Sequence, residues 1–106
     1  MNISYKDCLD ADGNFVDPTY SALIGQIVSI RTVTMTNVGR LEAVLPEAFL
    51  LSGAVWIAVT NRFSEYCANG SAKEVEPFAP DAPVYVAKGG VIDITPMPCV
   101  PVQPSN

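Results

Sequence analysis

Two β-rich runs near the C-terminus, residues 84–86 and 91–94, are separated by a short segment that contains Gly89 and Gly90. Their β-branched and aromatic side chains favour strands, and a glycine pair lets the chain change direction sharply. Almost no room is left for an ordinary loop. The sequence therefore predicts one bent strand pair here, and with it a small β-barrel with exposed strand edges.

Three earlier segments also have the character of strands. Residues 26–35 are rich in β-branched side chains, and Thr36-Asn37 is the expected turn after them. In residues 38–44 apolar and charged side chains alternate, and Gly39 indicates a bend or bulge. Residues 48–59 form an apolar run that fits one long or two short strands, although periodicity alone does not distinguish strands from a buried helix.

The whole chain, residues 1–106, is long enough for a single domain with its own core. A helix of two turns at most is expected at 17–25, because Asp17 can cap it and Pro18 suits its first position. An N-terminal extension is expected at 1–16 and a barrel at 17–95. Within the barrel, residues 60–83 form a variable excursion that holds one helical turn. The proline-rich tail at 96–106 is expected to be extended, draped on a surface or disordered.

Composition argues against a catalytic protein and for a self-associating one. Only 16% of the residues are charged and 49% are hydrophobic, whereas about a quarter of an average chain is charged. Some of this apolar surface is therefore expected to be covered by neighbouring subunits. The chain has no histidine, the commonest general base and metal ligand, and no motif for a catalytic site. We expect neither an enzyme nor a cofactor or metal.

The three cysteines, Cys8, Cys67 and Cys99, lie far apart and form no metal-binding or redox spacing. They are expected to be reduced thiols in a cytoplasmic protein. The apolar run at 48–59 is shorter than the roughly 18 residues that a membrane helix needs, so no membrane partner is expected.

The order of these features resembles the Sm and Sm-like (LSm) family over roughly residues 18–95. The resemblance rests on the short helix, the Ile-Gly-Gln-Ile-Val entry at 24–28, the bent Gly39-x-Leu41 strand and the final strand pair at a glycine turn. It implies a mainly β fold, a strongly bent five-stranded SH3-like barrel whose edge strands pair between subunits and close a ring of about five to seven copies.

The RNA-binding residues of that family are largely missing. The positions that correspond to its base-holding Asn and Arg are Phe49 and Ala87 in this chain. Phe49 could still stack on a base, with Lys88 and Arg40 as the remaining candidates for RNA contacts. Glu47, repeated around a pore, would repel phosphates. Lys88 also fits a structural role as a lysine that protects a strand edge.

Three functions fit these observations. The first is a ring-forming Sm-like scaffold or binding module whose partner beyond itself is unknown. The second is an Sm-like RNA-binding protein that uses a non-standard surface, with Arg31, Arg40 or Lys88 beside Phe49. The third is a small viral or mobile-element structural protein. Trp56 is expected to pack in the core or at a subunit interface under all three.

The net charge of −5 yields a prediction about RNA, because that charge multiplies around any ring. We expect no tight binding to short uridine- or adenosine-rich RNA at physiological salt, with affinity below the roughly micromolar level of non-specific binding. A filter-binding or anisotropy titration measures this. Nanomolar affinity that survives moderate salt and is lost on Phe49→Ala or Lys88→Ala would put the RNA-binding function first.

Overall fold

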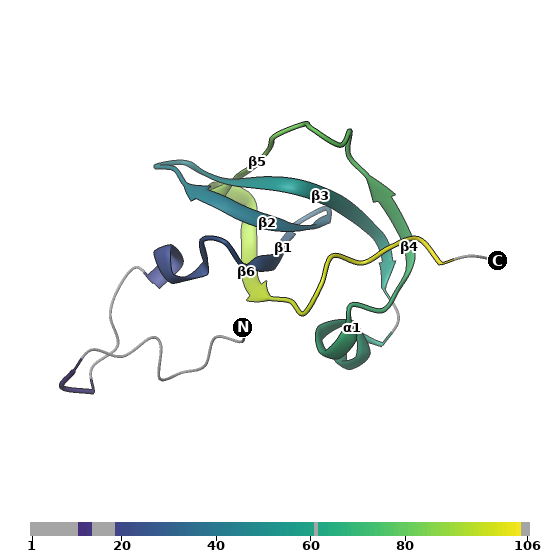
Figure 1. The fold of residues 1–106 in the computed structure, drawn as a ribbon, viewed down its shortest axis with the longest axis horizontal. Helices are drawn as coiled ribbons and strands as arrows, with labels where there is room; N and C mark the ends of the chain where they lie inside the picture. Colours follow the sequence, from purple (N-terminus) through teal and green to yellow (C-terminus); the bar gives the residue numbers. More distant parts are fainter. Residues whose placement is uncertain (1–10, 14–18, 61, 105–106) are drawn as a thin grey trace.

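A computed structural model of the protein describes residues 11–13, 19–60 and 62–104. These residues form six antiparallel strands in one unclosed sheet, with a short α-helix beside it (Figure 1). The mainly β fold is confirmed. A five-stranded barrel is not, because a sixth strand joins the sheet and the sheet stays open. In chain order the elements are η2 (Thr19–Leu23), β1 (Ile27–Thr32), β2 (Thr36–Val44), β3 (Ala48–Thr60), α1 (Phe63–Asn69), β4 (Ala72–Pro77), β5 (Val84–Ala87), η3 (Lys88–Gly90) and β6 (Val91–Pro96).

Strand β3 is the centre of the sheet. Its 13 residues form one continuous strand, which excludes the alternative of a buried helix at 48–59. β2 pairs along one side of β3, while the other side is shared: Ala48–Leu51 pairs with β5, and the segment from Val55 to Thr60 pairs with β4. One long strand therefore connects two parts of the sheet, and the strand order is β4-β3-β2-β1-β6 with β5 also on β3.

A glycine bulge lets β3 change partners half-way along. Val38 and Arg40, two residues apart on β2, pair with Val55 and Ser52, which are three residues apart on β3. β3 therefore has one residue more than β2 in this stretch. The additional residue lies at Gly53, whose φ of 55° is in the left-handed region. An extra residue of this kind bends a strand and increases its twist. Gly39, expected to mark a bend or bulge, lies in β2 opposite this bulge.

The sheet buries one cluster of side chains on each of its faces. The first is built by β1, β2, β3 and β5 and lies inside the curl of the sheet; its buried members are Val28, Ile30, Leu41, Phe49, Leu51, Ala54 and Val86. The second lies between the other face and α1; its buried members are Val38, Val55, Ile57, Tyr66, Ala72, Val75 and Met97. Because β1 supplies Val28 and Ile30 to one cluster and Ser29 to the other face, three consecutive residues of it are buried.

The chain reverses between β1 and β2 earlier than the sequence indicated. The prediction of a turn at Thr36-Asn37 is wrong, because both residues already belong to β2. The reversal lies before them and is closed by the amide of Thr32, which donates to the carbonyl of Met35 at 2.8 Å. The hydroxyl of Thr32 bonds the same carbonyl. Asn37 is 4% exposed, so its polarity is no sign of a surface turn.

The final two strands form as expected but do not pair with each other, so the predicted strand pair is wrong. β5 pairs with β3, and β6 pairs with β1 on the other side of the curl. Between them η3, a single 3-10 turn at Lys88–Gly90, carries the chain across. The glycine pair is therefore a crossing point between two parts of the sheet rather than the tip of a hairpin.

The region at 60–83, expected as an excursion, belongs partly to the sheet. It contains α1, which extends the expected helical turn, and β4, which the sequence did not predict because its Lys, Glu and Pro residues resemble a loop. The proline-rich tail is draped on the protein from Met97 to Pro104 and runs towards α1 and β4 (Figure 1). η2 matches the expected short helix, whereas Asp17, Pro18 and nearly all of the extension at 1–16 lie outside the described residues.

Replacing Gly39 with alanine should destabilise the fold. A Cβ there would lie 3.0 Å from the Ala54 Cβ and 3.0 Å from the Ser52 carbonyl oxygen, opposite the bulge. Overpacking of this kind costs about 1–3 kcal/mol, which urea unfolding would detect. Gly89→Ala is the matched control, since nothing lies within 4 Å of its Cβ position. Equal stability of the two variants would show that β2 and β3 do not approach this closely.

Candidate functional site

Two of the three candidate RNA-binding residues lie together. Phe49 of β3 pairs with Val86 of β5, and the amide of Lys88 donates to the Glu47 carbonyl at 2.9 Å, so η3 begins beside Phe49. The Lys88 Nζ lies 5.4 Å from the Phe49 ring centroid and 5.9 Å from that of Tyr20. Tyr20 meets Phe49 edge-on with centroids 5.0 Å apart. The ammonium is thus held over aromatic rings by cation–π attraction.

The burial of Phe49 changes what this cluster can do. Its side chain is 1% exposed and belongs to the first core, so its ring has no open face for a nucleobase. Lys88 is half-buried, and its charge is directed over the two rings. The arrangement anchors η3 and η2 to the sheet.

Arg40, the third candidate, has a different partner. It lies on β2 with a side chain that is 59% exposed, and its Nε is 3.5 Å from a carboxylate oxygen of Glu42. The hydroxyl of Ser52, on β3, donates to the same Glu42 oxygen. The guanidinium is therefore paired within the β2–β3 hairpin and does not belong to the cluster of Lys88, Phe49 and Tyr20.

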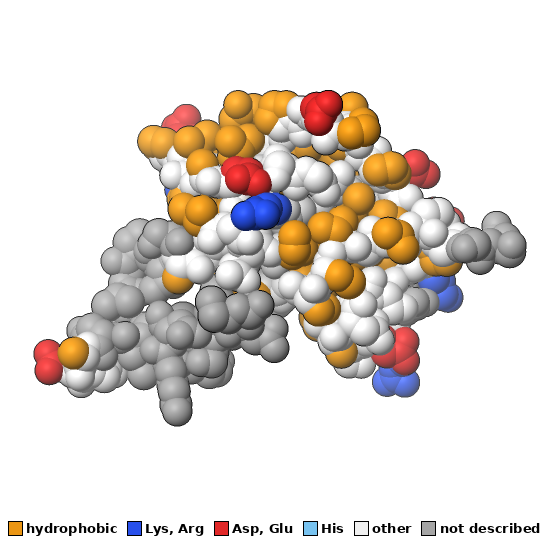
Figure 2. Space-filling view, in the orientation of Figure 1, with side chains coloured by type: hydrophobic (Ala, Val, Ile, Leu, Met, Phe, Trp, Pro, Cys, Tyr) orange, Lys and Arg blue, Asp and Glu red, His pale blue; other side chains and the backbone are white. Residues whose placement is uncertain are grey.

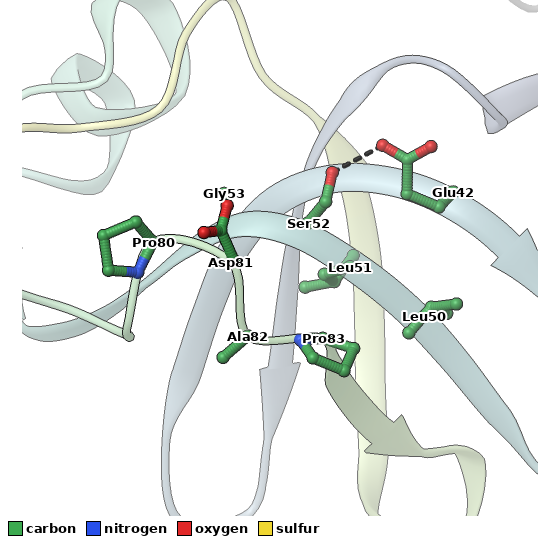
Figure 3. A pocket seen from close by; sticks show the side chains of 9 residues that line it. All are labelled: Glu42, Leu50, Leu51, Ser52, Gly53, Pro80, Asp81, Ala82 and Pro83. Atoms are coloured by element: carbon green, nitrogen blue, oxygen red, sulfur yellow. Dashed lines mark hydrogen bonds between the residues drawn. The ribbon is translucent and has the colours of Figure 1, made fainter.

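A cavity of about 290 Å³ lies beside the same hairpin (Figure 3). Its lining residues are Glu42, Leu50, Leu51, Ser52, Gly53, Pro80, Asp81, Ala82 and Pro83. Leu50, Ala82 and Pro83 give it an apolar wall, and Figure 3 shows Glu42 turned towards Ser52 rather than into the open space. It has no Lys or Arg among its lining residues. No group of three or more His, Cys, Asp or Glu that could hold a metal occurs within 11–13, 19–60 and 62–104.

A polar network fastens α1 to the sheet on the face opposite the first core. The hydroxyls of Tyr66 and Ser29 share a hydrogen bond of 2.7 Å, and both residues are buried. Phe63 stacks on Tyr66 with centroids 6.0 Å apart, and the guanidinium of Arg31 lies 4.9 Å from the Phe63 ring. These contacts join a helix to strand residues more than thirty positions away.

Arg31 is also held by an ion pair across β1 and β6. Its Nε donates to both carboxylate oxygens of Asp93 at 2.9 Å, its cross-strand neighbour. This hydrogen bond, more than the charge attraction, lowers the pKa of Asp93 and raises that of Arg31. No motif in the sequence indicates this network, because Arg31 and Asp93 meet only through the pairing of distant strands. Both side chains are more than a third exposed, so solvent screens their attraction.

No protein-family model, curated protein or solved structure matches this chain. The resemblance to Sm-like proteins therefore gains no support from comparison. Within the described residues, no helix has the length and apolar character required to cross a membrane. Cys67 and Cys99 are free thiols, and Cys8 lies outside the described residues.

The Tyr66–Ser29 bond leads to a pH-dependent prediction. Burial raises the pKa of Tyr66 above its usual value near 10, and the Ser29 bond offsets this only partly. The folded state therefore keeps its phenol proton at a pH where the unfolded chain releases it. The stability contributed by the neutral phenol is complete below pH ~10 and falls as the pH rises beyond it.

Tyr66→Phe should lose about 1 kcal/mol at neutral pH through the missing hydrogen bond. Its stability difference from wild type should shrink above pH ~10, where only wild type has this phenol to ionise. Urea midpoints measured from neutral to alkaline pH give both quantities. Tyr85→Phe, at an exposed position, is the control and should show a small difference throughout. A Tyr66→Phe difference that stays constant with pH would contradict the buried phenol.

Proposed function

We propose that the chain is a non-catalytic scaffold or binding module that assembles with copies of itself. The observation that carries this proposal is the set of strand edges. β4 and β6 end the strand order, and β5 pairs with β3 alone among the described strands. Unpaired edges are templates for pairing with another chain unless they are covered.

The β5–η3–β6 segment is the best-placed edge for such assembly. β5 and β6 follow each other through one 3-10 turn, and each has a strand on one side only. Tyr85 and Ile92, one on each strand, are both 62% exposed. Burial of large apolar side chains of this kind contributes about 1.5–3 kcal/mol each. An interface here would pair backbone groups and cover apolar surface together.

The surface composition supports the same proposal. Figure 2 shows hydrophobic side chains over much of the described face, with few charged groups between them. The exposed large hydrophobic residues are Tyr20, Ile24, Val33, Met35, Trp56, Val59, Phe63, Tyr85, Ile92 and Val102. Trp56 is 36% exposed, so an interface could bury it further.

The finer version of the proposal is the Sm-like ring. Strands β1, β2, β3, β5 and β6 would form a strongly bent barrel, open between β5 and β6. The β5 edge of one copy would pair with the β6 edge of the next. Such a head-to-tail contact repeats from copy to copy and closes a ring when its rotation allows. The exposed edges and side chains support this version, and solution mass distinguishes a ring from a dimer.

The other two functions have weaker support. No contact among the candidate residues favours RNA binding, since Phe49 is buried and Arg40 is paired with Glu42. RNA binding therefore stays an untested alternative. A viral or mobile-element structural protein would use the same edges. Self-association therefore does not separate that function from a cellular scaffold, whereas the neighbouring genes would.

Light scattering at micromolar concentration should give a mass that is a multiple of 11.3 kDa. Tyr85→Asp or Ile92→Asp should reduce that mass, because each variant puts a charge into the proposed interface without a partner. Val33→Asp is the control: Val33 is 79% exposed and lies in the β1–β2 reversal, so its mass should match wild type. A wild-type particle of 11.3 kDa would contradict the proposal.

A further inference from the structure

The outer edge of β4 is covered by a side chain instead of a strand. The amide of Val75 donates to Oε1 of Gln103 at 2.7 Å. Nε2 of Gln103 donates to the carbonyl of Lys73 at 3.3 Å. One carboxamide thus supplies an acceptor and a donor to backbone groups two residues apart, as a residue of a neighbouring strand would.

The tail that delivers Gln103 fits a groove between β4 and the end of α1. Met97 is 8% exposed, its amide donates to the Ile27 carbonyl at 2.8 Å, and Pro101 is buried. The thiol of Cys99 lies 3.5 Å from the Asn69 carbonyl oxygen. A Cβ on Gly70 would come within 2.6 Å of the Cys99 Sγ, so a larger residue at this position would require the thiol to move.

We define the tail groove by the residues from the end of α1 to β4 that face this segment: Asn69, Gly70, Ser71, Ala72, Lys73 and Val75. A cavity of about 440 Å³ remains between the tail and the first four of them. Pro98, Pro101 and Pro104 favour an extended tail and limit the entropy lost when it binds.

Beyond Met97, the attachment of the described tail consists of side-chain contacts. The hydrogen bonds involve Gln103 and Cys99, and Val100 packs against the second core. No backbone-to-backbone hydrogen bond links residues 98–104 to the rest of the described chain. Such a segment detaches at a lower free energy than the paired strands. Pro98 and Cys99 are exposed, so the chain can open there without losing buried contacts.

We propose that the tail groove is a recognition site for the extended segment Val100–Pro104, and that in the assembled protein a second copy supplies this segment. The inference rests on the proposed self-association. When two copies exchange their tails, each tail makes in the other copy the contacts that it makes within its own chain. The free-energy cost of the swap is therefore small beyond that of opening the chain at Pro98 and Cys99. Gln103 is the specificity-determining residue, because its carboxamide is the group that bonds the β4 backbone.

The direct test uses the full-length Gln103→Ala variant, which lacks the carboxamide that bonds the β4 backbone. Exchange of the Val75 amide, followed by NMR, should become about five- to tenfold faster than in wild type, as expected for the loss of one such hydrogen bond. Gln103→Glu keeps an acceptor for Val75 but lacks the donor for Lys73, so it should show a smaller change. Unchanged melting temperatures would show that both variants stay folded.

A synthetic peptide with the sequence of residues 97–104, with serine at the position of Cys99, is then added to Gln103→Ala. It should restore protection of the Val75 amide, and the same peptide with alanine at the position of Gln103 should bind at least tenfold more weakly. Equal binding of both peptides would make the groove a general proline-rich site. Absence of restored protection at millimolar peptide would also overturn the proposal.

Solution mass separates this inference from the proposed function. If copies exchange tails, Gln103→Ala should lower the mass of the assembly or shift its dissociation to higher protein concentration. An oligomer whose mass and dissociation are unchanged in this variant would overturn the exchange while leaving self-association intact. A monomeric wild type would overturn both self-association and exchange, and the peptide titration would still report on the groove within one chain.

Discussion

The glycine bulge in β3 is the constraint on which the rest of this structure depends. A straight strand of 13 residues would present one edge in one direction, whereas the bulge at Gly53 bends β3 so that β5 and β4 pair with different halves of that edge. The close approach of Gly39 to Ala54 keeps β2 paired across the bend. The same bend separates two buried clusters on opposite faces of the sheet.

The bend also determines which strand edges are left open. Because β5 and β4 share β3, neither continues into the other, and their outer edges stay available for a side chain or another strand. The polar groups that could have formed a site are used within the fold instead. Lys88 lies over Phe49, and Arg31 bonds Asp93. This use of the polar groups is why we propose an assembly module, in which backbone edges and apolar surface would supply the interactions.

Much of the strand content could be predicted from the sequence because it follows local side-chain preference. The β-branched runs that became β1, β5 and β6 are examples. Pairing could not be predicted in this way, because it depends on contacts between distant residues. β4 was missed since Lys73, Glu74 and Pro77 resemble a loop, although Ala72 and Val75 face the second core.

The candidate site shows the same limit. The resemblance to Sm-like proteins grouped Phe49 with Lys88, which lie together, and with Arg40, which does not join them. The burial of Phe49 could not be predicted, since an aromatic residue in a strand can face either side. The role of Gln103 had no signal in a proline-rich tail. A glutamine that satisfies a strand edge is recognisable only when the strand and the tail are placed beside each other.

Amide hydrogen exchange of the full-length protein, compared at low and high concentration, tests most directly whether the open edges of β5 and β6 are used for assembly. Our account predicts slower exchange at high concentration within 84–87 and 91–96, with β2 unchanged because it is paired on both sides. Exchange in β5 and β6 that is the same at both concentrations would contradict it.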